Sequence, residues 1–195
     1  MREGLTAAVI AGGAGRRMGT DKRAMRVDGI PLLVRSVAAV SRVADEVLVS
    51  TMRGRPVPVD LPDVRVVEDR VPDGGPLAGI EAALAAASYP LVLVVAADMP
   101  WLAEGLLELL VARARVASDA GAVAIRSDRG LEPLLAVYRR TTLTVVTGLV
   151  DSGEHRVGHL LEMVVTIAVP PEEWRRVDPY GRSLVNLNAP DDLPT

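Results

Sequence analysis

Apolar residues along this chain fall into short continuous runs that alternate with stretches of helical spacing. The runs Leu5–Ala11 and Leu91–Ala96 are almost wholly apolar, which is typical of strands covered on both faces of a parallel sheet. Apolar positions recur at helical spacing in Pro31–Val43, where the proline suits a first turn. Further strands are predicted at Val47–Thr51, Val64–Val67, Gly121–Arg126, Pro133–Tyr138 and Val164–Val169, with a short extended segment at Leu184–Leu187. Further helices are predicted at Leu77–Ser88, Trp101–Ala117, Thr141–Val150 and Val157–Glu162.

This alternation of strands and helices predicts crossover connections and a mostly parallel sheet with helices on both sides. The 195 residues suffice for one domain with a substantial core, and no internal repeat or linker divides them. We therefore expect an α/β fold, formed as a single Rossmann-like three-layer domain over residues 1–195.

Composition excludes several classes of protein. With 22 basic and 25 acidic residues, two tryptophans, three tyrosines and no phenylalanine, the chain lacks the basic surplus and stacking aromatics of nucleic-acid-binding proteins. It has no cysteine, so it forms neither a disulfide nor a cysteine-ligated zinc site. The longest apolar run, Leu91–Ala97, is too short to span a bilayer, and charged residues follow Met1 directly. We expect a cytoplasmic protein without membrane contact.

A glycine-rich segment, AVIAGGAGRRMGTDKRAM at residues 8–25, is the most informative part of the sequence. A buried strand that ends in such a loop offers backbone N–H groups to an anion, with cationic side chains close behind. The P-loop spacing is absent because two residues separate Gly19 from Lys22, and the G-x-G-x-x-G pattern fails at Met18. Binding of a triphosphate is the functional interpretation, and a tight glycine turn with surface arginines is the structural one.

The pattern G-G-x-G-x-R-M-G-x-D-K, which begins at Gly12, resembles the signature of nucleotidyltransferases that transfer a nucleotide to a phosphorylated acceptor. Its double glycine and its Asp21-Lys22 pair are most similar to the molybdenum cofactor guanylyltransferase family. The resemblance implies a fold like that of nucleotide-diphospho-sugar transferases. It also implies transfer of GMP from GTP to the phosphate of molybdopterin, which yields molybdopterin guanine dinucleotide and pyrophosphate. Mg²⁺ as cofactor and transient contact with molybdenum-cofactor insertion or acceptor proteins are further implications.

The same resemblance assigns roles to individual residues of the segment. It implies that phosphates and nucleotide are bound by Ala11, Gly12, Gly13, Gly15 and Lys22. Arg17 and Lys22 are the implied catalytic cations, which neutralise the phosphates while backbone amides hold them.

Asp98 follows the apolar strand Leu91–Ala96 and precedes Met99-Pro100. Open α/β sheets bind ligands outside the carboxyl ends of their strands, so this carboxylate is expected to face the same crevice as the glycine-rich segment. It could hold Mg²⁺, which prefers hard oxygen ligands, or it could cap a helix. The resemblance favours the metal, because A-x-D-M-P is the segment in which these transferases carry their metal-binding aspartate, here Asp98.

A polar loop at residues 68–80, EDRVPDGGPLAGI, is a candidate guanine pocket. A carboxylate there can accept hydrogen bonds from the guanine N1–H and 2-amino groups, and backbone groups near Gly75 can meet O6 and N7. The G-P-L-x-G-I part resembles the guanine pocket of the family, with Asp69 as the implied carboxylate and Asp73 as the alternative. Without the resemblance, the segment is simply a loop and a helix start.

The tail NLNAPDDL at residues 186–193 resembles the family pattern N-x-N-T-P-x-D-L, with Ala189 in place of threonine. Asparagines two apart on an extended segment point the same way, so both can face the crevice. Asn188 is implied to contact the nucleotide, whereas a turn is the alternative interpretation of the tail.

Two departures from the family pattern bear on specificity. The asparagine often found after the second strand is replaced by Ser50-Thr51-Met52, and the H-P-L segment on the acceptor side reads Glu132-Pro133-Leu134. The sequence therefore leaves the choice between GTP and CTP open, and Glu132 receives no role. The alternatives are cytidylyl or guanylyl transfer to another phosphorylated acceptor and a non-catalytic nucleotide-binding regulator.

Overall fold

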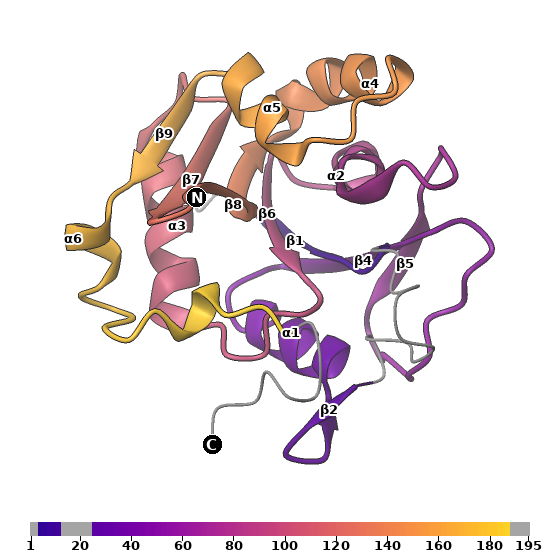
Figure 1. Ribbon diagram of the computed structural model, residues 1–195, viewed down its shortest axis with the longest axis horizontal. Coiled ribbons are helices and arrows are strands. Elements are labelled where there is room, and N and C mark those ends of the chain that lie inside the picture. Colours follow the sequence, from indigo (N-terminus) through magenta and orange to yellow (C-terminus); the bar gives the residue numbers. More distant parts are fainter. Residues whose placement is uncertain (1–3, 13–24, 188–195) are drawn as a thin grey trace.

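Seven strands form the central sheet, in the spatial order β5-β4-β1-β6-β8-β7-β9. The computed structural model describes residues 4–12 and 25–187 (Figure 1). The sheet strands are β1 (Leu5–Ile10), β4 (Glu46–Thr51), β5 (Arg65–Glu68), β6 (Leu91–Ala96), β7 (Ala122–Ser127), β8 (Gly130–Arg139) and β9 (Thr166–Val169). Strand β8 pairs antiparallel with β6 and β7, whereas the remaining pairs are parallel. The expected mostly parallel sheet of a single α/β domain is confirmed.

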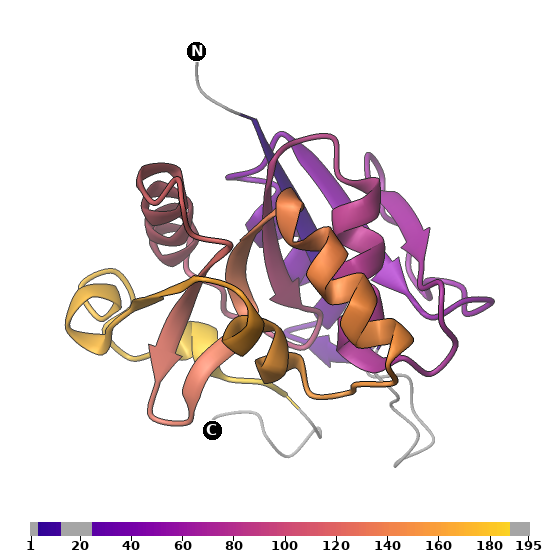
Figure 2. The ribbon, with the colours of Figure 1, turned by 90° about the horizontal axis from the view of Figure 1, so that it is seen from above.

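Helices cover both faces of the sheet and give three layers (Figure 2). Helices α1 and α3 pack with the apolar core on one face, and α2, α4 and α5 pack with the core on the other. The helices are α1 (Leu32–Val40), α2 (Gly75–Ala86), α3 (Glu104–Val116), α4 (Leu143–Asp151), α5 (Val157–Met163) and α6 (Pro171–Trp174), with 3-10 turns η2 (Arg140–Thr142) and η3 (Arg182–Leu184).

Alternate side chains of β1 enter the two cores. Leu5, Ala7 and Val9 belong to the core beneath α1 and α3, and Ala8 and Ile10 belong to the core beneath α2 and α4. Every residue of β1 and of β6 is buried, because a strand covered on both faces has no solvent-facing side. The continuous apolar runs in the sequence are the consequence.

A small hairpin was not predicted from the sequence. Strands β2 (Arg26–Val27) and β3 (Ile30–Pro31) pair antiparallel around Asp28-Gly29. These two turn residues have φ angles of 52° and 76°, as a type I′ turn requires. Strands of two residues are too short to show alternating apolar and polar positions. The Asp28-Gly29 pair was the sequence signal that could have indicated the hairpin.

Several predicted boundaries differ from those of the structure. Helix α3 begins at Glu104 rather than Trp101, and α2 begins at Gly75 rather than Leu77, with a proline in its first turn. The extended segment predicted at Leu184–Leu187 is wrong at its start, because Leu184 completes the turn η3. The short helix α6 was missed, and the helix predicted from Thr141 begins within the 3-10 turn η2, before α4 starts at Leu143.

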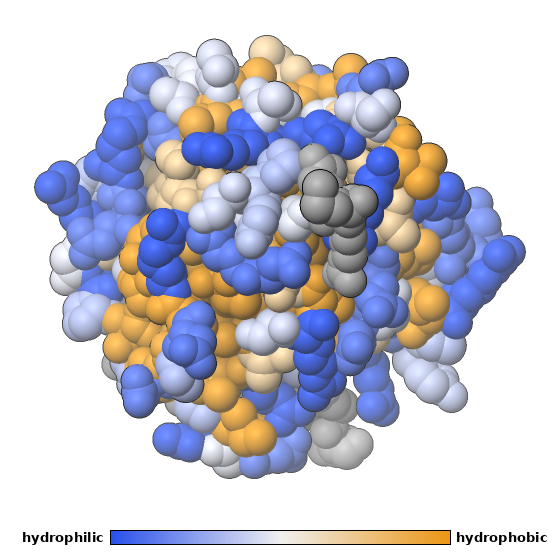
Figure 3. All heavy atoms as spheres, turned by 180° about the vertical axis from the view of Figure 1, so that it is seen from behind, coloured by the Kyte–Doolittle hydropathy of each residue, from blue (hydrophilic) through white to orange (hydrophobic). Residues whose placement is uncertain are grey.

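Charged and apolar side chains are mixed over the surface seen from behind (Figure 3). Each helix within the described ranges falls short of the length and apolarity needed to cross a bilayer.

Candidate active site

The carboxyl ends of four neighbouring parallel strands meet at one edge of the sheet. β1 and β6 pair in register up to Ile10 opposite Ala96, and the Ala97 N–H then donates to the Ile10 carbonyl at 3.1 Å. On the other side of β1, the Ala11 N–H donates to the Ser50 carbonyl at 2.8 Å. Gly12 and Asp98, each two residues beyond the end of its strand, therefore lie at the same edge. In open α/β sheets this edge is where ligands bind.

Asp69 lies directly against Gly12. Its N–H donates to the Thr51 carbonyl at 2.9 Å, and the Ser50 hydroxyl donates to Asp69 Oδ1 at 2.6 Å. A Cβ atom on Gly12 would lie 2.8 Å from Asp69 Oδ2, closer than real Cβ contacts allow. A side chain at position 12 would therefore displace the Asp69 carboxylate from the strand end. Sequence reasoning singled out Gly12 and Asp69 but missed Ser50, whose hydroxyl fixes the carboxylate.

Burial raises the pKa of Asp69 to about 6, from an ordinary value of 3.8. The nearby carboxylates of Glu68 and Glu81 raise it further, and the hydrogen bond from Ser50 opposes both effects. The side chain is only 3% exposed. A ligand that donates hydrogen bonds to this carboxylate would stabilise its ionised form.

Asp73, the other candidate in this loop, is exposed and has a φ of 55°. The structure therefore brings Asp69, and not Asp73, to the side of Gly12. Gly75 is the first residue of α2 and has a φ of 66°, a conformation that side chains rarely adopt. Space lies open where its Cβ would be. Its backbone is accessible at a helix start.

A second buried carboxylate lies on α2 behind Asp69. Glu81 is 5% exposed, and its Oε1 accepts a hydrogen bond from Arg70 Nη2 at 2.9 Å. The same Arg70 nitrogen contacts Asp151 Oδ1 at 2.6 Å, which joins α2 to the end of α4. This arginine compensates the charge of Glu81 and ties the loop after Asp69 to two helices.

The C-terminal segment is attached to the residue that carries the predicted metal ligand. The Leu187 N–H donates to the backbone carbonyl of Asp98 at 3.0 Å, and the Leu187 side chain is fully buried against Val27 and Leu32. Asn186 Oδ1 is buried and accepts no hydrogen bond from the described part of the chain. Leu187 thus lies at the Asp98 edge.

Five of the predicted site residues lie outside the described residues: Gly13, Gly15, Arg17, Lys22 and Asn188. Their roles stay predictions. Within residues 4–12 and 25–187, no three histidine or acidic side chains gather as a ready-made metal site. Asp98 would therefore have to share a metal with substrate oxygens and water, which is how Mg²⁺ is commonly bound.

Comparison with known proteins identifies the family. Residues 7–168 match the family described as the MobA-like NTP transferase domain. The chain belongs to this family. It is 39% identical over 188 residues, 95% of this chain and 89% of the other, to a probable molybdenum cofactor guanylyltransferase of Chloroflexus aggregans. MobA-like members are nucleotidyltransferases, and this chain is an enzyme of that class.

Solved structures agree with the MobA-like assignment. Molybdopterin-guanine dinucleotide biosynthesis protein A of Archaeoglobus fulgidus superposes with a TM-score of 0.80 at 26% identity, over 96% of this chain and 94% of that one. The 2-C-methyl-D-erythritol 4-phosphate cytidylyltransferase of Thermus thermophilus gives 0.65 at 21% identity, over 98% and 95%. The second likeness shows a common fold.

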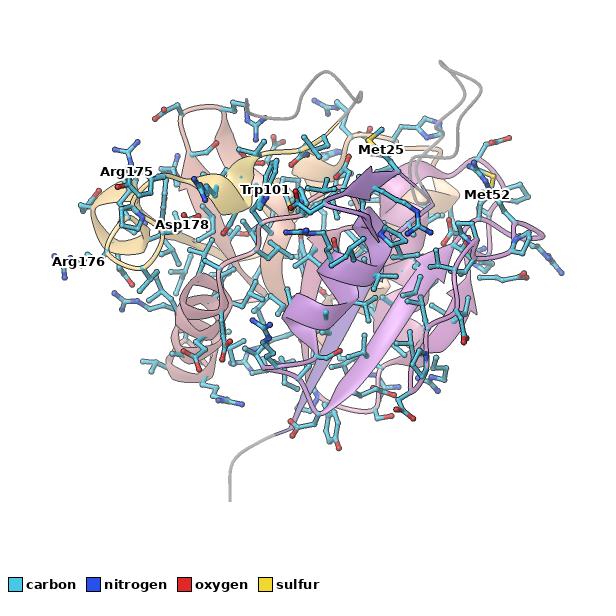
Figure 4. The ribbon with its side chains drawn as sticks, turned by 90° about the horizontal axis from the view of Figure 1, so that it is seen from below. Met25, Met52, Trp101, Arg175, Arg176 and Asp178 are labelled. Atoms are coloured by element: carbon cyan, nitrogen blue, oxygen red, sulfur yellow. The ribbon has the colours of Figure 1, made fainter. Side chains whose placement is uncertain are left out.

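Two positions at which this MobA-like chain departs from the expected pattern have defined surroundings. Met52 lies half-buried at the end of β4, along the same side of the molecule as Met25 and Trp101 (Figure 4). Glu132 accepts hydrogen bonds from the Ser127 hydroxyl at 2.6 Å and from Arg129 Nη2 at 3.1 Å. These bonds hold Glu132 within the β7–β8 hairpin, which gives it a structural explanation.

Proposed function

We propose that this enzyme transfers GMP from GTP to the terminal phosphate of molybdopterin in a Mg²⁺-dependent reaction. The products are molybdopterin guanine dinucleotide and pyrophosphate. The names of the relatives support this substrate pair. The observation that carries the proposal is the shared edge on which Gly12, Asp69 and Asp98 lie, because the carboxylate proposed to bind the base and the carboxylate proposed to bind the metal then lie on the two sides of the strand end at Gly12.

In the proposed reaction, an oxygen of the acceptor phosphate forms a bond to the α-phosphorus of GTP. The bond from that phosphorus to the bridging oxygen breaks, and the electron pair leaves with pyrophosphate. No covalent enzyme intermediate is needed, because positioning and charge neutralisation supply most of the catalysis. Backbone amides from Gly12 to Gly15 hold the phosphates, and Arg17 and Lys22 neutralise them.

Asp98 is the residue proposed to hold Mg²⁺. A bound Mg²⁺ withdraws charge from the phosphate oxygens at the reacting centre. The Leu187 N–H donates to the backbone carbonyl of Asp98. This bond fixes the backbone from which the Asp98 side chain extends. A hard carboxylate oxygen at the sheet edge where Gly12 also lies fits the ligand preference of this ion.

Asp69 is the residue proposed to select guanine. Guanine presents N1–H and a 2-amino group side by side, and an ionised carboxylate accepts from both. Cytosine presents one donor beside an acceptor, which would face the second carboxylate oxygen unfavourably. The Ser50 hydroxyl at 2.6 Å orients Asp69. Backbone groups near Gly75 meet O6 and N7.

Product analysis tests the proposed reaction. The purified protein is incubated with each of the four nucleoside triphosphates, Mg²⁺ and molybdopterin, and the products are identified by mass. We expect molybdopterin guanine dinucleotide and one equivalent of pyrophosphate with GTP, and at least ten-fold less product with CTP. Preferential formation of a cytidine product would move the enzyme to the alternative cytidylyl transfer. Binding of GTP without product or pyrophosphate would instead indicate a regulator.

A further inference from the structure

The segment that carries Asp98 is held by hydrogen bonds to all of its backbone carbonyls. The carbonyl oxygens of residues 97–101 each lie between 3.0 and 3.3 Å from a donor that belongs to another part of the chain. In the order of these carbonyls, the donors are Ser36 Oγ, the Leu187 N–H, Ser36 Oγ, Arg35 Nε and Ser183 Oγ. Two adjacent residues of α1 thus supply the contacts on one side of the segment.

Ser36 is fully buried and faces the two carbonyls that flank Asp98. Its hydroxyl lies 3.3 Å from the Ala97 oxygen and 3.2 Å from the Met99 oxygen. A hydroxyl has one hydrogen, which it shares between or alternates across these acceptors. Both hydrogen bonds that the Ser36 hydroxyl makes within the described ranges go to the Asp98 segment.

Arg35 contacts two different segments at once. Its Nε donates to the Pro100 carbonyl at 3.3 Å, while its Nη1 donates to the Val27 carbonyl at 3.2 Å and to Asp28 Oδ2 at 3.3 Å. Val27 and Asp28 belong to the β2–β3 hairpin, which closely follows the glycine-rich segment in the chain. The arginine side chain is 22% exposed, and its bonds to the Pro100 and Val27 carbonyls are part-buried, whereas its bond to Asp28 lies at the surface. A planar guanidinium can span both acceptors with fixed geometry.

We propose that Arg35 is a positioning residue that couples the hairpin after the glycine-rich segment to the segment bearing Asp98. Through these bonds it fixes Val27 and Asp28, which follow the proposed phosphate-binding segment in the chain, relative to the strand end that bears Asp98, the proposed metal ligand. This role rests on the proposed nucleotidyl transfer, in which both parts must meet the same triphosphate. A misplacement of about 1 Å can lower a reaction rate about a hundred-fold, so a bond far from the reacting atoms affects turnover.

Amide hydrogen exchange of the full chain, without ligands, tests the coupling directly. Arg35→Met keeps the length of the side chain and removes its donors. We expect faster exchange, by several-fold, in peptides covering residues 25–31 and residues 97–103. Ser36→Ala should accelerate exchange only in residues 97–103. Arg42→Met is the matched control, because Arg42 lies just beyond α1, is 66% exposed and pairs only loosely with Glu104 at 3.6 Å; it should change neither peptide.

Steady-state kinetics show the consequence for the reaction. Arg35→Met should lower kcat at least ten-fold while the KM for GTP changes less than three-fold, because the nucleotide contacts themselves remain. Arg35→Lys should recover little of the loss, since one ammonium cannot span both carbonyls. If Arg35→Met fails to fold, Arg35→Lys takes its place in both experiments.

Three results would overturn the coupling. They are unchanged exchange in either peptide of Arg35→Met, an increase spread evenly over the whole chain, and wild-type turnover by Arg35→Lys. If the wild-type enzyme transfers no nucleotide from any of the four triphosphates, the proposed function is contradicted instead. The exchange pattern would still decide whether Arg35 joins the two segments.

Discussion

Replacing Asp98 by asparagine is expected to lower the rate of nucleotidyl transfer by about a thousand-fold, or about 4 kcal/mol of barrier. The substitution keeps the size of the side chain and removes the charge that would hold Mg²⁺ against the phosphates. The backbone carbonyl of Asp98, which accepts the Leu187 N–H at 3.0 Å, is unaffected. The fold should therefore persist. Pyrophosphate release under saturating GTP and acceptor measures the rate, and thermal unfolding checks the fold.

Asp119→Asn is the matched control for this substitution. Asp119 is exposed and lies between α3 and the start of β7, at the opposite edge of the sheet. It makes the same change of charge far from the proposed site, so turnover should stay within about two-fold of wild type. Equal activity of the Asp98 and Asp119 variants would remove Asp98 from the mechanism.

Asp69→Asn is expected to remove a pH dependence of stability that the wild-type enzyme shows. The pKa of Asp69 is raised from 3.8 to about 6 in the folded chain. Protonation is thus easier in the folded than in the unfolded state, and the free energy of unfolding falls as the pH rises from about 4 to about 6. A shift of this size corresponds to about 3 kcal/mol. Below pH 4 both states are protonated and the loss is absent.

Denaturant unfolding at intervals between pH 4 and pH 8 measures this dependence. The free energy of unfolding of the wild-type enzyme should fall between about pH 4 and about pH 6. That of Asp69→Asn should lack this fall. The same variant should bind GTP about a hundred-fold more weakly, because two hydrogen bonds to a charged acceptor are lost. Asp73→Asn alters the exposed carboxylate of the same loop and should change neither property. The hypothesis about Asp69 fails if Asp73→Asn, and not Asp69→Asn, weakens GTP binding.

The strands that carry the site were predictable because the apolar residues of each segment are enough to indicate its burial. Leu5–Ala11 and Leu91–Ala96 are apolar throughout, so their burial in a parallel sheet follows from composition alone. Once the sheet is parallel, the residues after these strands must share an edge. That Gly12 and Asp98 share one edge of the sheet was therefore foreseeable, and the register of β1 with β6 agrees with it.

The contacts that orient the site were not predictable, because they join residues far apart in the chain. The Ser36 hydroxyl meets carbonyls 61 and 63 positions away, and Arg35 meets one 65 positions away. Nothing in a helical pattern distinguishes a serine that faces a loop from one that faces solvent. The direction of β8 also depends on a hairpin turn rather than on its apolar content. Long-range packing decides such features.

A crystal structure of the enzyme with GTP and Mn²⁺ tests the central claim most directly, because anomalous scattering locates the metal independently of the protein. The account predicts one Mn²⁺ bonded to the Asp98 carboxylate and to triphosphate oxygens. It also predicts that the triphosphate lies along the backbone that starts at Gly12 and that the guanine N1–H donates to Asp69. A metal bound away from Asp98, or a nucleotide bound at another edge of the sheet, would contradict it.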